Sequence, residues 1–448
     1  MGARPRLADP ILPLLSAAAA AIGVEAWAVG GYVRDRLLNR PHSEIDVVVT
    51  GGRGPDLAER FAELSGATRP VVFERFGTAQ VVWRDRHIEF ASARSESYRR
   101  DSRKPSVKPA TIEDDLRRRD FTVNTLLMDF EGRVEDRLGG GLADLEANLL
   151  RTPLDPLTTF DDDPLRMLRG IRFAAELDFR LDPSLAPAMR SLAGRLRPPV
   201  VSVERVADEL GKMLLGRRPK LALELLDECG LLPEVLPELA ACKAVQQGGF
   251  HTHDVFGHTI LAVSLTPPEL VVRLAALFHD VGKPGTAAPD GSFLGHEKVG
   301  AELATAAMTR LRLPNAVVER VARLVLLHLR PVFYGSDWTD GAVRRLARDA
   351  GTDLDALMEL ARADIGASAY DQPEKLDELA VRLEEARGER PSRLRAAISG
   401  RDIMRIRGVP SGPEVGRLKA RLDELVVEGT IEPEREALLR YLEDHPDL

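Results

Sequence analysis

Hydrophobic and polar positions follow two different periods along the chain, and the change between them divides the sequence. Up to about residue 138, the runs "IDVVV" and "VVFERFGTAQVVWRDRHIEFASAR" have the spacing of strands, the second of a hairpin with charged turns. From residue 142 onward nearly every segment has helical spacing, as in "DDPLRMLRGIRFAAEL" and "VERVADELGKMLL". The pattern therefore predicts an α+β chain, with strands and helices first and helices alone afterwards.

One apolar stretch near the start could be mistaken for a targeting segment. Residues 11–24, "ILPLLSAAAAAIGV", are apolar enough to resemble the core of a secretory signal. Asp9 and Pro10 interrupt the order from basic to apolar, and cleavage within the alanine run would leave Gly30 close to a new terminus. We therefore expect a helix that leads into the first strand. Elsewhere no apolar run reaches the length of a membrane span, so we expect no membrane association.

Length, charge and cysteine content narrow the class of protein. A chain of 448 residues is long enough for three or four domains. The net charge of −8 does not indicate a nucleic-acid binder, but it does not exclude one, because phosphate contacts need only a local basic stripe. Cys229 and Cys242 are too few for a disulfide framework, which makes a reducing cytoplasm the expected location.

Two acidic residues stand at the entrance of a strand that should be buried. Side chains two apart in a strand point to the same side, so Glu44 and Asp46 project together ahead of a run of valines. Close carboxylates repel unless a cation lies between them, which favours a magnesium site. Upstream, Gly30 and Gly31 permit close backbone approach, and a helix beginning near Tyr32 would direct N–H groups at an anion. A surface turn with solvated acids is the alternative.

Further motifs follow this stretch in one order. "GGYVRDRLL" and the acids precede "RRRDFTVNTLLMD" at 117–129 and "DDPLRMLRGIRFAAEL" at 162–177. "HTHDVFGHTI", "LAALFHDVGKPGT", "FLGHEKVGAE" and "LLHLRPV" come next, and "ISGRDIMRIRGVPSGPEVG" lies near the end. The chain resembles the bacterial (class II) CCA tRNA nucleotidyltransferase and poly(A) polymerase family with a C-terminal HD domain, and the resemblance spans nearly the whole sequence.

The resemblance implies four successive parts. A nucleotidyltransferase palm, a small mixed sheet with helices, would occupy residues 1–140. A helical neck that selects the nucleotide would occupy 141–215, a helical body with the HD-type domain 216–370, and a helical tail that binds tRNA 371–448. The body and tail would contact the elbow and acceptor side of the tRNA through its shape and phosphates.

The resemblance also implies a two-metal transfer of nucleotides from CTP and ATP to the 3′ end of tRNA. Glu44 and Asp46 would hold two Mg²⁺ ions, while Gly30, Gly31 and Arg34 would hold the triphosphate. The RNA 3′-hydroxyl would attack the α-phosphorus in line and release pyrophosphate.

The acidic pair departs from the family, which usually has Asp-x-Asp. Glu44 occupies the first place, and its extra methylene displaces the carboxylate where magnesium geometry is strict. Either the strand compensates, or Asp46 carries most of the coordination. Glu89, in "HIEF", is a weaker candidate for a third acid, and an exposed strand residue is an equal alternative.

The "RRRDFTVN" motif fits a role in binding. Arg118 and Arg119 offer guanidinium forks for phosphates, and Asn124 could donate to or accept from a ribose hydroxyl. Asp120 fits better as a group that orients the arginines or caps a helix. A basic surface patch at a helix start is the alternative.

The "DDPLRMLRGIR" segment suggests residues that recognise the nucleotide base by hydrogen bonds to its edge. Asp163 and Arg166 are three apart, which places them on one helix face, with Arg169 continuing the row. A carboxylate beside a guanidinium matches the amino donor and ring-nitrogen acceptor of cytosine and adenine, and opposes the reversed order in guanine and uracil. In the family the motif begins with Glu, where this chain has Asp162. Arg172 would meet the triphosphate; an i,i+3 ion pair on a solvated helix is the alternative.

A polar segment lies between the hairpin and the arginine motif. It reads "SESYRRDSRKPSVKPATIEDD", and its prolines prevent a helix. We expect a mobile basic loop that meets the RNA end or helps the pocket change from C to A, or one that is merely solvated. Its basic residues are Arg99, Arg100, Arg103, Lys104 and Lys108.

The HD-type motifs predict a second metal site. Histidines and carboxylates from separate helices can bind a transition metal and activate water for phosphoester hydrolysis. Such a site would act on phosphates of the RNA end or on a cyclic nucleotide, or the domain would serve only as a scaffold. The predicted ligands are His258, His279, Asp280 and Asp364, and His296 and His328 fit the extended pattern.

Three other functions stay open at this stage. A specialised CC-adding or A-adding enzyme is compatible with the Glu44 and Asp162 replacements. A poly(A) polymerase would share the N-terminal motifs but typically carries a strongly basic C-terminal extension. An HD phosphohydrolase with a degenerate N-terminal part belongs to a different class. The oligomeric state is left open.

Overall fold

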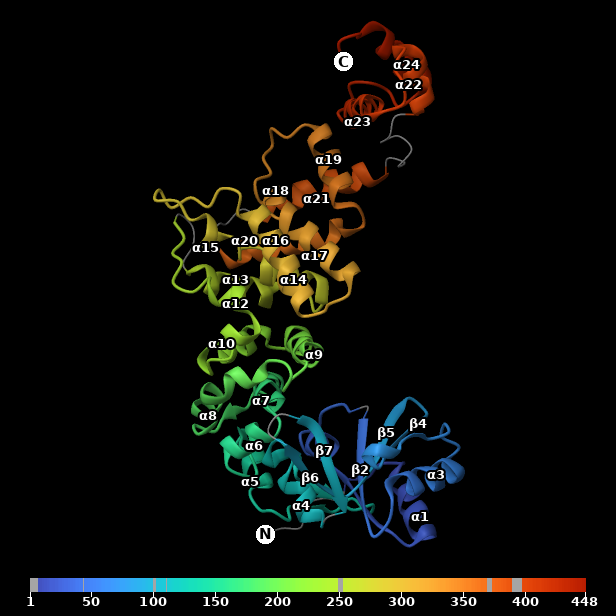
Figure 1. Cartoon of the computed structure of the whole chain (residues 1–448), viewed down its shortest axis with the longest axis vertical. Helices are drawn as coiled ribbons and strands as arrows, with labels where there is room; N and C mark the ends of the chain where they lie inside the picture. Colours follow the sequence, from blue (N-terminus) through green and yellow to red (C-terminus); the bar gives the residue numbers. More distant parts are fainter. Residues whose placement is uncertain are drawn as a thin grey trace. The chain divides into compact units, whose positions relative to one another are not determined.

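The structure is a computed structural model in which the chain divides into two compact units, Met1–Pro237 and Glu238–Leu448 (Figure 1). It describes residues 7–42, 44–99, 102–109, 111–248, 253–368, 373–388 and 397–448. The predicted boundaries at residues 140, 215 and 370 stay predictions.

A mixed sheet forms the centre of the first unit's strand-rich part. Its order is β3-β4-β5-β2-β1-β8-β9, in which β2 and β5 are parallel and the other neighbours are antiparallel. This confirms the predicted small mixed sheet. The strands are β1 (Glu25–Val29), β2 (Glu44–Thr50), β3 (Val71–Phe73), β4 (Thr78–Trp83), β5 (Arg86–Ser92), β8 (Leu127–Met128) and β9 (Val134–Glu135).

Strand β2 alternates between solvent and core at its beginning. Ile45 is fully buried, whereas Glu44 and Asp46 are reached by solvent, and the valines that follow are buried. The register places Asp46 opposite Val29 of β1 and Glu89 of β5. Three short or medium helices accompany these strands: α1 (Leu12–Ile22), α2 (Gly31–Leu37) and α3 (Gly54–Ser65), and α1 is the helix expected ahead of the first strand.

The segment predicted to be a mobile basic loop contains two strands. β6 (Arg94–Arg99) and β7 (Ser102–Pro109) form a separate antiparallel pair. The prolines exclude a helix, as expected, but they are compatible with strands that have an unpaired edge. Arg100 lies outside the described residues, as do the side chains of Arg99, Arg103, Lys104 and Lys108.

Helices complete the first unit, together with short strands and turns. The helix α7 packs against α9 and α10, and its buried face includes Met167, Leu168 and Ile171. Gly170 lets this helix approach its neighbours, because a Cβ there would lie 2.9 Å from Phe121 Cζ. The elements are α4 (Ile112–Arg117), η2 (Thr122–Asn124), α5 (Gly141–Glu146), β10 (Leu149–Leu150), α6 (Pro156–Asp162), α7 (Leu165–Leu177), β11 (Arg180–Leu181), α8 (Leu185–Leu192), α9 (Val203–Leu215), α10 (Pro219–Glu228) and α11 (Leu232–Val235).

The placement of Asp163 on a helix face was wrong. The helix α7 begins at Leu165, and Asp163 follows α6 with an extended backbone at φ −141° and ψ 97°. Pro164 disfavours helical geometry in the residue before it, which separates Asp163 from the helix that carries Arg166.

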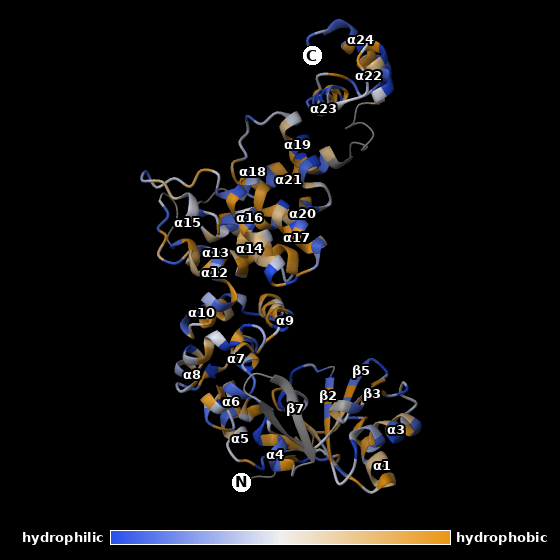
Figure 2. Cartoon of the chain, in the orientation of Figure 1, coloured by the Kyte–Doolittle hydropathy of each residue, from blue (hydrophilic) through white to orange (hydrophobic). Residues whose placement is uncertain are grey.

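The second unit is helical in its described residues. Helix α14 is buried along most of its length and contacts α13, α16, α17 and α20 (Figure 2). The longer helices are α13 (Val255–Leu265), α14 (Leu270–Phe278), α16 (His296–Arg310), α17 (Asn315–Leu327), α19 (Asp340–Ala350), α20 (Leu354–Ala367) and α21 (Pro373–Gly388). The short helices are α12 (Pro237–Ala240), α15 (Lys283–Thr286) and α18 (Leu329–Val332).

Three further helices end the second unit and share a core of their own. They are α22 (Gly400–Arg407), α23 (Pro413–Val427) and α24 (Arg435–Asp444), and their core includes Ile403, Leu422 and Leu438. The described helices of the whole chain include none with the length and apolar character needed to cross a membrane.

Candidate active site

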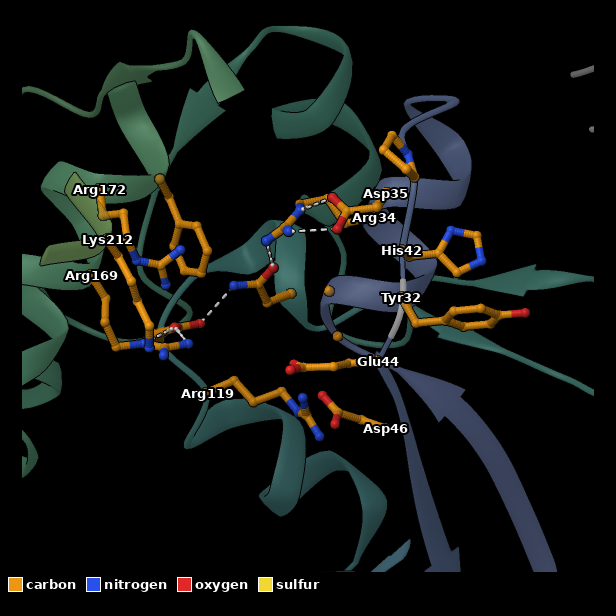
Figure 3. Close-up of a pocket in the computed structure, with 16 residues that line it drawn as sticks. Tyr32, Arg34, Asp35, His42, Glu44, Asp46, Arg119, Arg169, Arg172 and Lys212 are labelled. Atoms are coloured by element: carbon orange, nitrogen blue, oxygen red, sulfur yellow. Dashed lines mark hydrogen bonds and ion pairs between the residues drawn. The ribbon is translucent and has the colours of Figure 1, made fainter. Parts of the chain in front are cut away.

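An open pocket of about 700 Å³ lies where β2 and α2 begin, and α7 and α9 contribute its other side (Figure 3). The structure brings most of the predicted nucleotide site into this pocket. The predicted residues that line it are Gly30, Gly31, Arg34, Glu44, Asp46, Arg119, Asn124, Arg169 and Arg172.

Three carboxylates stand side by side at this edge of the sheet. Glu44 and Asp46 line the pocket, and Glu89 lies beside Asp46 on the parallel strand β5, where its Oε2 accepts a 3.1 Å hydrogen bond from Gln80. Although solvent reaches Asp46 from the pocket, withdrawal from bulk water raises the pKa of its carboxyl to about 6. The Arg119 charge opposes the rise, and Glu89 and Glu44 add to it. The arrangement therefore favours the binding of a cation or a proton.

Gly30 makes room for these groups. Its φ of 75° and ψ of −138° belong to a region that side-chain-bearing residues rarely adopt. A Cβ at this position would lie 2.9 Å from Arg119 Nη1 and 3.3 Å from Asp46 Oδ2. Helix α2 begins immediately afterwards at Gly31, so its first-turn N–H groups lie next to the carboxylates, as the sequence predicted.

A chain of hydrogen bonds connects α2 to α7. Arg34 Nη1 donates to Asn124 Oδ1 at 2.7 Å, and Asn124 Nδ2 donates to Asp120 Oδ1 at 2.9 Å. Arg169 donates twice to Asp120 Oδ2, at 2.9 and 2.7 Å. Burial alone would raise the pKa of Asp120, but Arg169 and Asn124 outweigh it and hold that pKa well below its usual range. Asp120 thus orients Arg169, whereas the arginines of its own motif, Arg118 and Arg119, bond to Asp115. Asn124 orients Arg34.

Sequence reasoning missed the pocket residues Phe173 and Lys212, and the carboxylate behind them. The guanidinium carbons of Arg34, Arg169 and Arg172 lie 4.9, 5.2 and 4.3 Å from the centre of the Phe173 ring. Glu209 of α9 accepts from Arg172 Nε at 2.8 Å. The spacing in "RVADELGK" gave a weak signal, because Arg205, Glu209 and Lys212 share one face of a helix.

Three predicted binding residues do not line the pocket. Arg118 bonds to Asp115 at 3.0 and 2.7 Å. Arg166 donates to the carbonyl oxygens of Thr159 and Arg118, at 3.1 and 2.5 Å. Asp163 Oδ2 accepts from Arg205 of α9 at 3.0 Å.

The predicted HD ligands gather in the second unit as two adjacent groups. Within each group the ligand atoms lie within 4.8 Å of one another. The first comprises His258, His279 and Asp364, and the second comprises Asp280, His296 and His328. Asp280 joins the groups, because its two oxygens lie 3.2 Å from His279 Nε2 and 3.4 Å from His296 Nε2.

Backbone carbonyls orient all four imidazoles. Each Nδ1 lies 2.6 to 3.3 Å from a main-chain oxygen, and the Nε2 atoms face one another, at 3.2 Å for His258 and His279 and at 3.3 Å for His296 and His328. When each Nδ1–H donates to its carbonyl, the facing Nε2 atoms carry lone pairs only. Those pairs repel one another unless a cation lies between them.

The pKa values of the histidines also indicate that the cluster favours a positive charge. Burial lowers the pKa of His279, but Asp280 and Asp364 outweigh it and raise that pKa to about 10. Burial and the His279 charge lower the pKa of His328 to about 4. Without metal, His279 therefore holds a proton beside the carboxylates of Asp280 and Asp364.

Three families match successive parts of the chain. Residues 26–151 match "Poly A polymerase head domain", residues 178–243 match "Probable RNA and SrmB- binding site of polymerase A", and residues 250–365 match "HD domain". The CC-adding tRNA nucleotidyltransferase of Thermus thermophilus is 36% identical over 428 residues, which are 92% of this chain and 92% of the relative. The chain belongs to the tRNA nucleotidyltransferase family.

Other members of the family differ in which nucleotides they add. The A-adding tRNA nucleotidyltransferase of Deinococcus radiodurans is 37% identical over 359 residues, which cover 75% of this chain and 81% of the relative. The structure of the Bacillus stearothermophilus CCA-adding enzyme in complex with CTP is 25% identical, covers 98% of both chains and gives a TM-score of 0.69. The protein is therefore an enzyme, a nucleotidyltransferase, of a family that depends on divalent metal.

Gly30→Ala should inactivate nucleotide incorporation. The positive φ costs about 1–2 kcal/mol for any L-residue, and the added Cβ also displaces Arg119 and Asp46. The matched control is Gly23→Ala, where φ is 68° but a Cβ meets nothing within 4 Å. Both variants should lose stability in thermal unfolding, Gly30→Ala more because of its contacts, whereas only Gly30→Ala should lose at least about tenfold in incorporation rate. Equal rates in the two variants would contradict the role of Gly30.

Asp46→Asn should stabilise the metal-free protein above pH 6. A carboxyl with a raised folded pKa loses stability as pH rises from the unfolded value of 3.8 to about 6, and asparagine removes that loss. With Mg²⁺ the order should reverse, because only the wild-type carboxylate binds the ion. Melting temperatures at pH 5 and pH 8, with chelator and with Mg²⁺, test this. Asp56→Asn, at an exposed acid of α3, should show neither effect.

Proposed function

We propose that this enzyme adds the C and A residues of the 3′-terminal CCA to tRNA from CTP and ATP, without a nucleic-acid template, in the cytoplasm. The observation that supports this most directly is the pocket in which Glu44 and Asp46 stand opposite a row of arginines. Family members named for CC, A and CCA addition support the substrate class. Specialised CC or A addition is the alternative within the family.

The acidic edge fits two magnesium ions. Its ligands are carboxylate oxygens, which Mg²⁺ prefers. Burial, with a further contribution from the neighbouring Glu89 and Glu44 charges, raises the pKa of Asp46. Mg²⁺ bound to Glu44 and Asp46 would lower the pKa of the RNA 3′-hydroxyl and neutralise charge on the departing pyrophosphate. Glu89 lies close enough to Asp46 to serve as a third acid. The longer Glu44 side chain is accommodated at the exposed first position of β2, where His87 of β5 lies opposite it and the pairing with β1 begins only at Asp46.

The remaining pocket residues hold the triphosphate. Arg34 is fixed by Asn124 and Asp35, and Arg169 is fixed by Asp120, so both guanidinium groups are oriented before the nucleotide arrives. Catalysis of this kind depends on positioning and on neutralising charge, which preorganised arginines supply. The first-turn N–H groups of α2 add donors for phosphate oxygens.

Asp163 and Arg166 select the base. Both are held in one orientation, Asp163 by Arg205 and the Leu165 N–H, and Arg166 by two carbonyl oxygens. A fixed acceptor beside a fixed donor accepts the edges of cytosine and adenine, and places a carboxylate against a carbonyl of guanine or uracil. Although neither residue lines the pocket, the Arg166 charge acts on Asp120, which does. The second unit would contact the acceptor and elbow regions of tRNA through phosphates.

The test of this function uses three tRNA transcripts that end before CCA, after C and after CC. Each receives Mg²⁺ and one labelled nucleoside triphosphate, and then CTP together with ATP. Completion of CCA on all three, with UTP and GTP refused, is the expected result. Products that stop after CC, or labelling of the CC-ending transcript alone by ATP, would show a specialised enzyme. Asp163→Asn should reduce the preference for CTP over UTP by about tenfold or more, whereas Asp161→Asn should leave it unchanged.

The facing imidazole pairs support a second activity, hydrolysis of phosphoesters at the HD site. Nitrogen and carboxylate donors in two adjacent groups fit two transition-metal ions, with Asp280 between them. Such ions would supply a metal-bound hydroxide at neutral pH. Lys283 donates to Asp280 Oδ2 at 2.6 Å and places a positive charge beside the cluster. Terminal or cyclic phosphates of RNA are the proposed substrates.

Variants can separate the two sites. Asp280→Asn should abolish the rise in melting temperature produced by Ni²⁺, Co²⁺ or Mn²⁺ and the hydrolysis of 2′,3′-cyclic nucleotides, and leave nucleotide incorporation intact. Asp46→Asn should do the reverse. Asp290→Asn, at an exposed loop acid, is the control. If none of these metals changes the melting temperature of the wild-type protein, the second unit does not contain the proposed metal site.

A further inference from the structure

Lys212 is a cation in the nucleotide pocket that comes from a different helix than the arginines. It lies on α9 and lines the pocket beside Arg169 and Arg172 (Figure 3). Its ammonium group bonds to Asp208 at 2.7 Å and lies 3.9 Å from Glu209. No motif of the sequence pointed to it.

One face of α9 is directed at the residues of the pocket. Arg205, Glu209 and Lys212 are spaced by four and three residues, so they share this face. Arg205 holds Asp163, and the buried carboxylate of Glu209 holds Arg172. Arg172 fixes Glu209, so that its carboxylate lies 3.9 Å from Lys212 and favours an ammonium group at the wall of the pocket.

Lys212 can leave its carboxylate partner at a lower energetic cost than the pocket arginines can leave theirs. Its side chain is 51% exposed, whereas those of the arginines are between 7% and 35% exposed. Arg169 and Arg172 neutralise the buried carboxylates of Asp120 and Glu209, and removing such a partner costs several kcal/mol.

The partner of Lys212 can be given up easily. Asp208 is exposed, and an exposed i,i+4 ion pair contributes little to stability. An incoming polyphosphate needs charge that is not already committed to a buried carboxylate. Lys212 can supply that charge without leaving a buried acid unpaired.

We propose that Lys212 binds the β- or γ-phosphate of the incoming nucleotide, exchanging Asp208 for the phosphate. This assignment rests on the proposed function and adds to it a residue of the neck helix α9. It places the triphosphate between the row of α7 arginines and α9. The bound triphosphate would then contact cations on both α7 and α9, so substrate binding would depend on the packing of these two helices.

A thermodynamic cycle tests the assignment without turnover. The affinities of CTP and CMP are measured by calorimetry with Mg²⁺ and without tRNA, for the whole protein and for Lys212→Gln. The variant should bind CTP about tenfold more weakly and CMP less than twofold more weakly, because a charge-assisted hydrogen bond to phosphate is lost. Lys212→Arg should recover most of the affinity for CTP. The control is Lys220→Gln, on α10, where an exposed lysine pairs with Glu224 at 3.7 Å outside this pocket.

The outcomes separate this inference from the function on which it rests. Wild-type protein that binds no CTP would overturn both. Wild-type protein that binds CTP, with Lys212→Gln equal to it or weakened equally for CTP and CMP, would overturn only the assignment of Lys212. A variant that binds CTP normally but loses affinity for tRNA would transfer the contact to an RNA phosphate and would also overturn the assignment.

Discussion

The buried ion pair between Asp120 and Arg169 is the interaction on which the nucleotide site depends. Asp120 follows α4, and Arg169 lies in the middle of α7, so the pair joins the strand-rich part of the first unit to its helical part. A buried charge without its partner costs several kcal/mol, and the position of α7 is therefore coupled to the loop that contains Asp120. Asn124 extends the pair to Arg34, and Gly30 lies one turn before that arginine.

The pocket has an acidic side and a basic side, and each repels further charge of its own sign. At the end of β2, carboxylates crowd together and the pKa of Asp46 rises to about 6, which favours uptake of a proton or a metal. On the opposite side, guanidinium groups surround the Phe173 ring, and Arg169 and Arg172 of α7 each pair with a buried carboxylate. A triphosphate with bound Mg²⁺ would bring phosphate anions to the guanidinium side and a cation to the carboxylate side. The charges of the pocket are therefore complementary to those of a magnesium-bound triphosphate.

The HD cluster applies the same principle with different donors. Imidazole nitrogens replace most of the oxygens, and backbone carbonyls hold each ring so that its free nitrogen faces a neighbour. Oxygen ligands at β2 suit a hard ion, and the nitrogen-rich cluster suits a transition metal. The two sites lie in separate compact units, so each can be altered without removing the ligands of the other.

The sequence by itself determined the features that depend on residues close together in the chain. Alternation predicted β2 and the exposure of Glu44 and Asp46, helical spacing predicted the helical remainder, and the order of the motifs predicted the family. Local rules failed at Pro164, which ends the helical geometry that spacing alone assigned to Asp163, and at the basic segment, where prolines exclude helices but not the strands β6 and β7.

Only the tertiary structure decided which charges meet. The roles of Asp120, Glu209 and Lys212 depend on contacts between α7, α9 and the loop after α4, and these residues lie between 37 and 49 positions from their arginine partners or outside any motif. The pairing of the imidazoles likewise joins helices far apart in the chain. Spacing along one element fixes the side to which a residue points, but the electrostatic energy of a buried group depends on what packs against that side, which the fold as a whole decides.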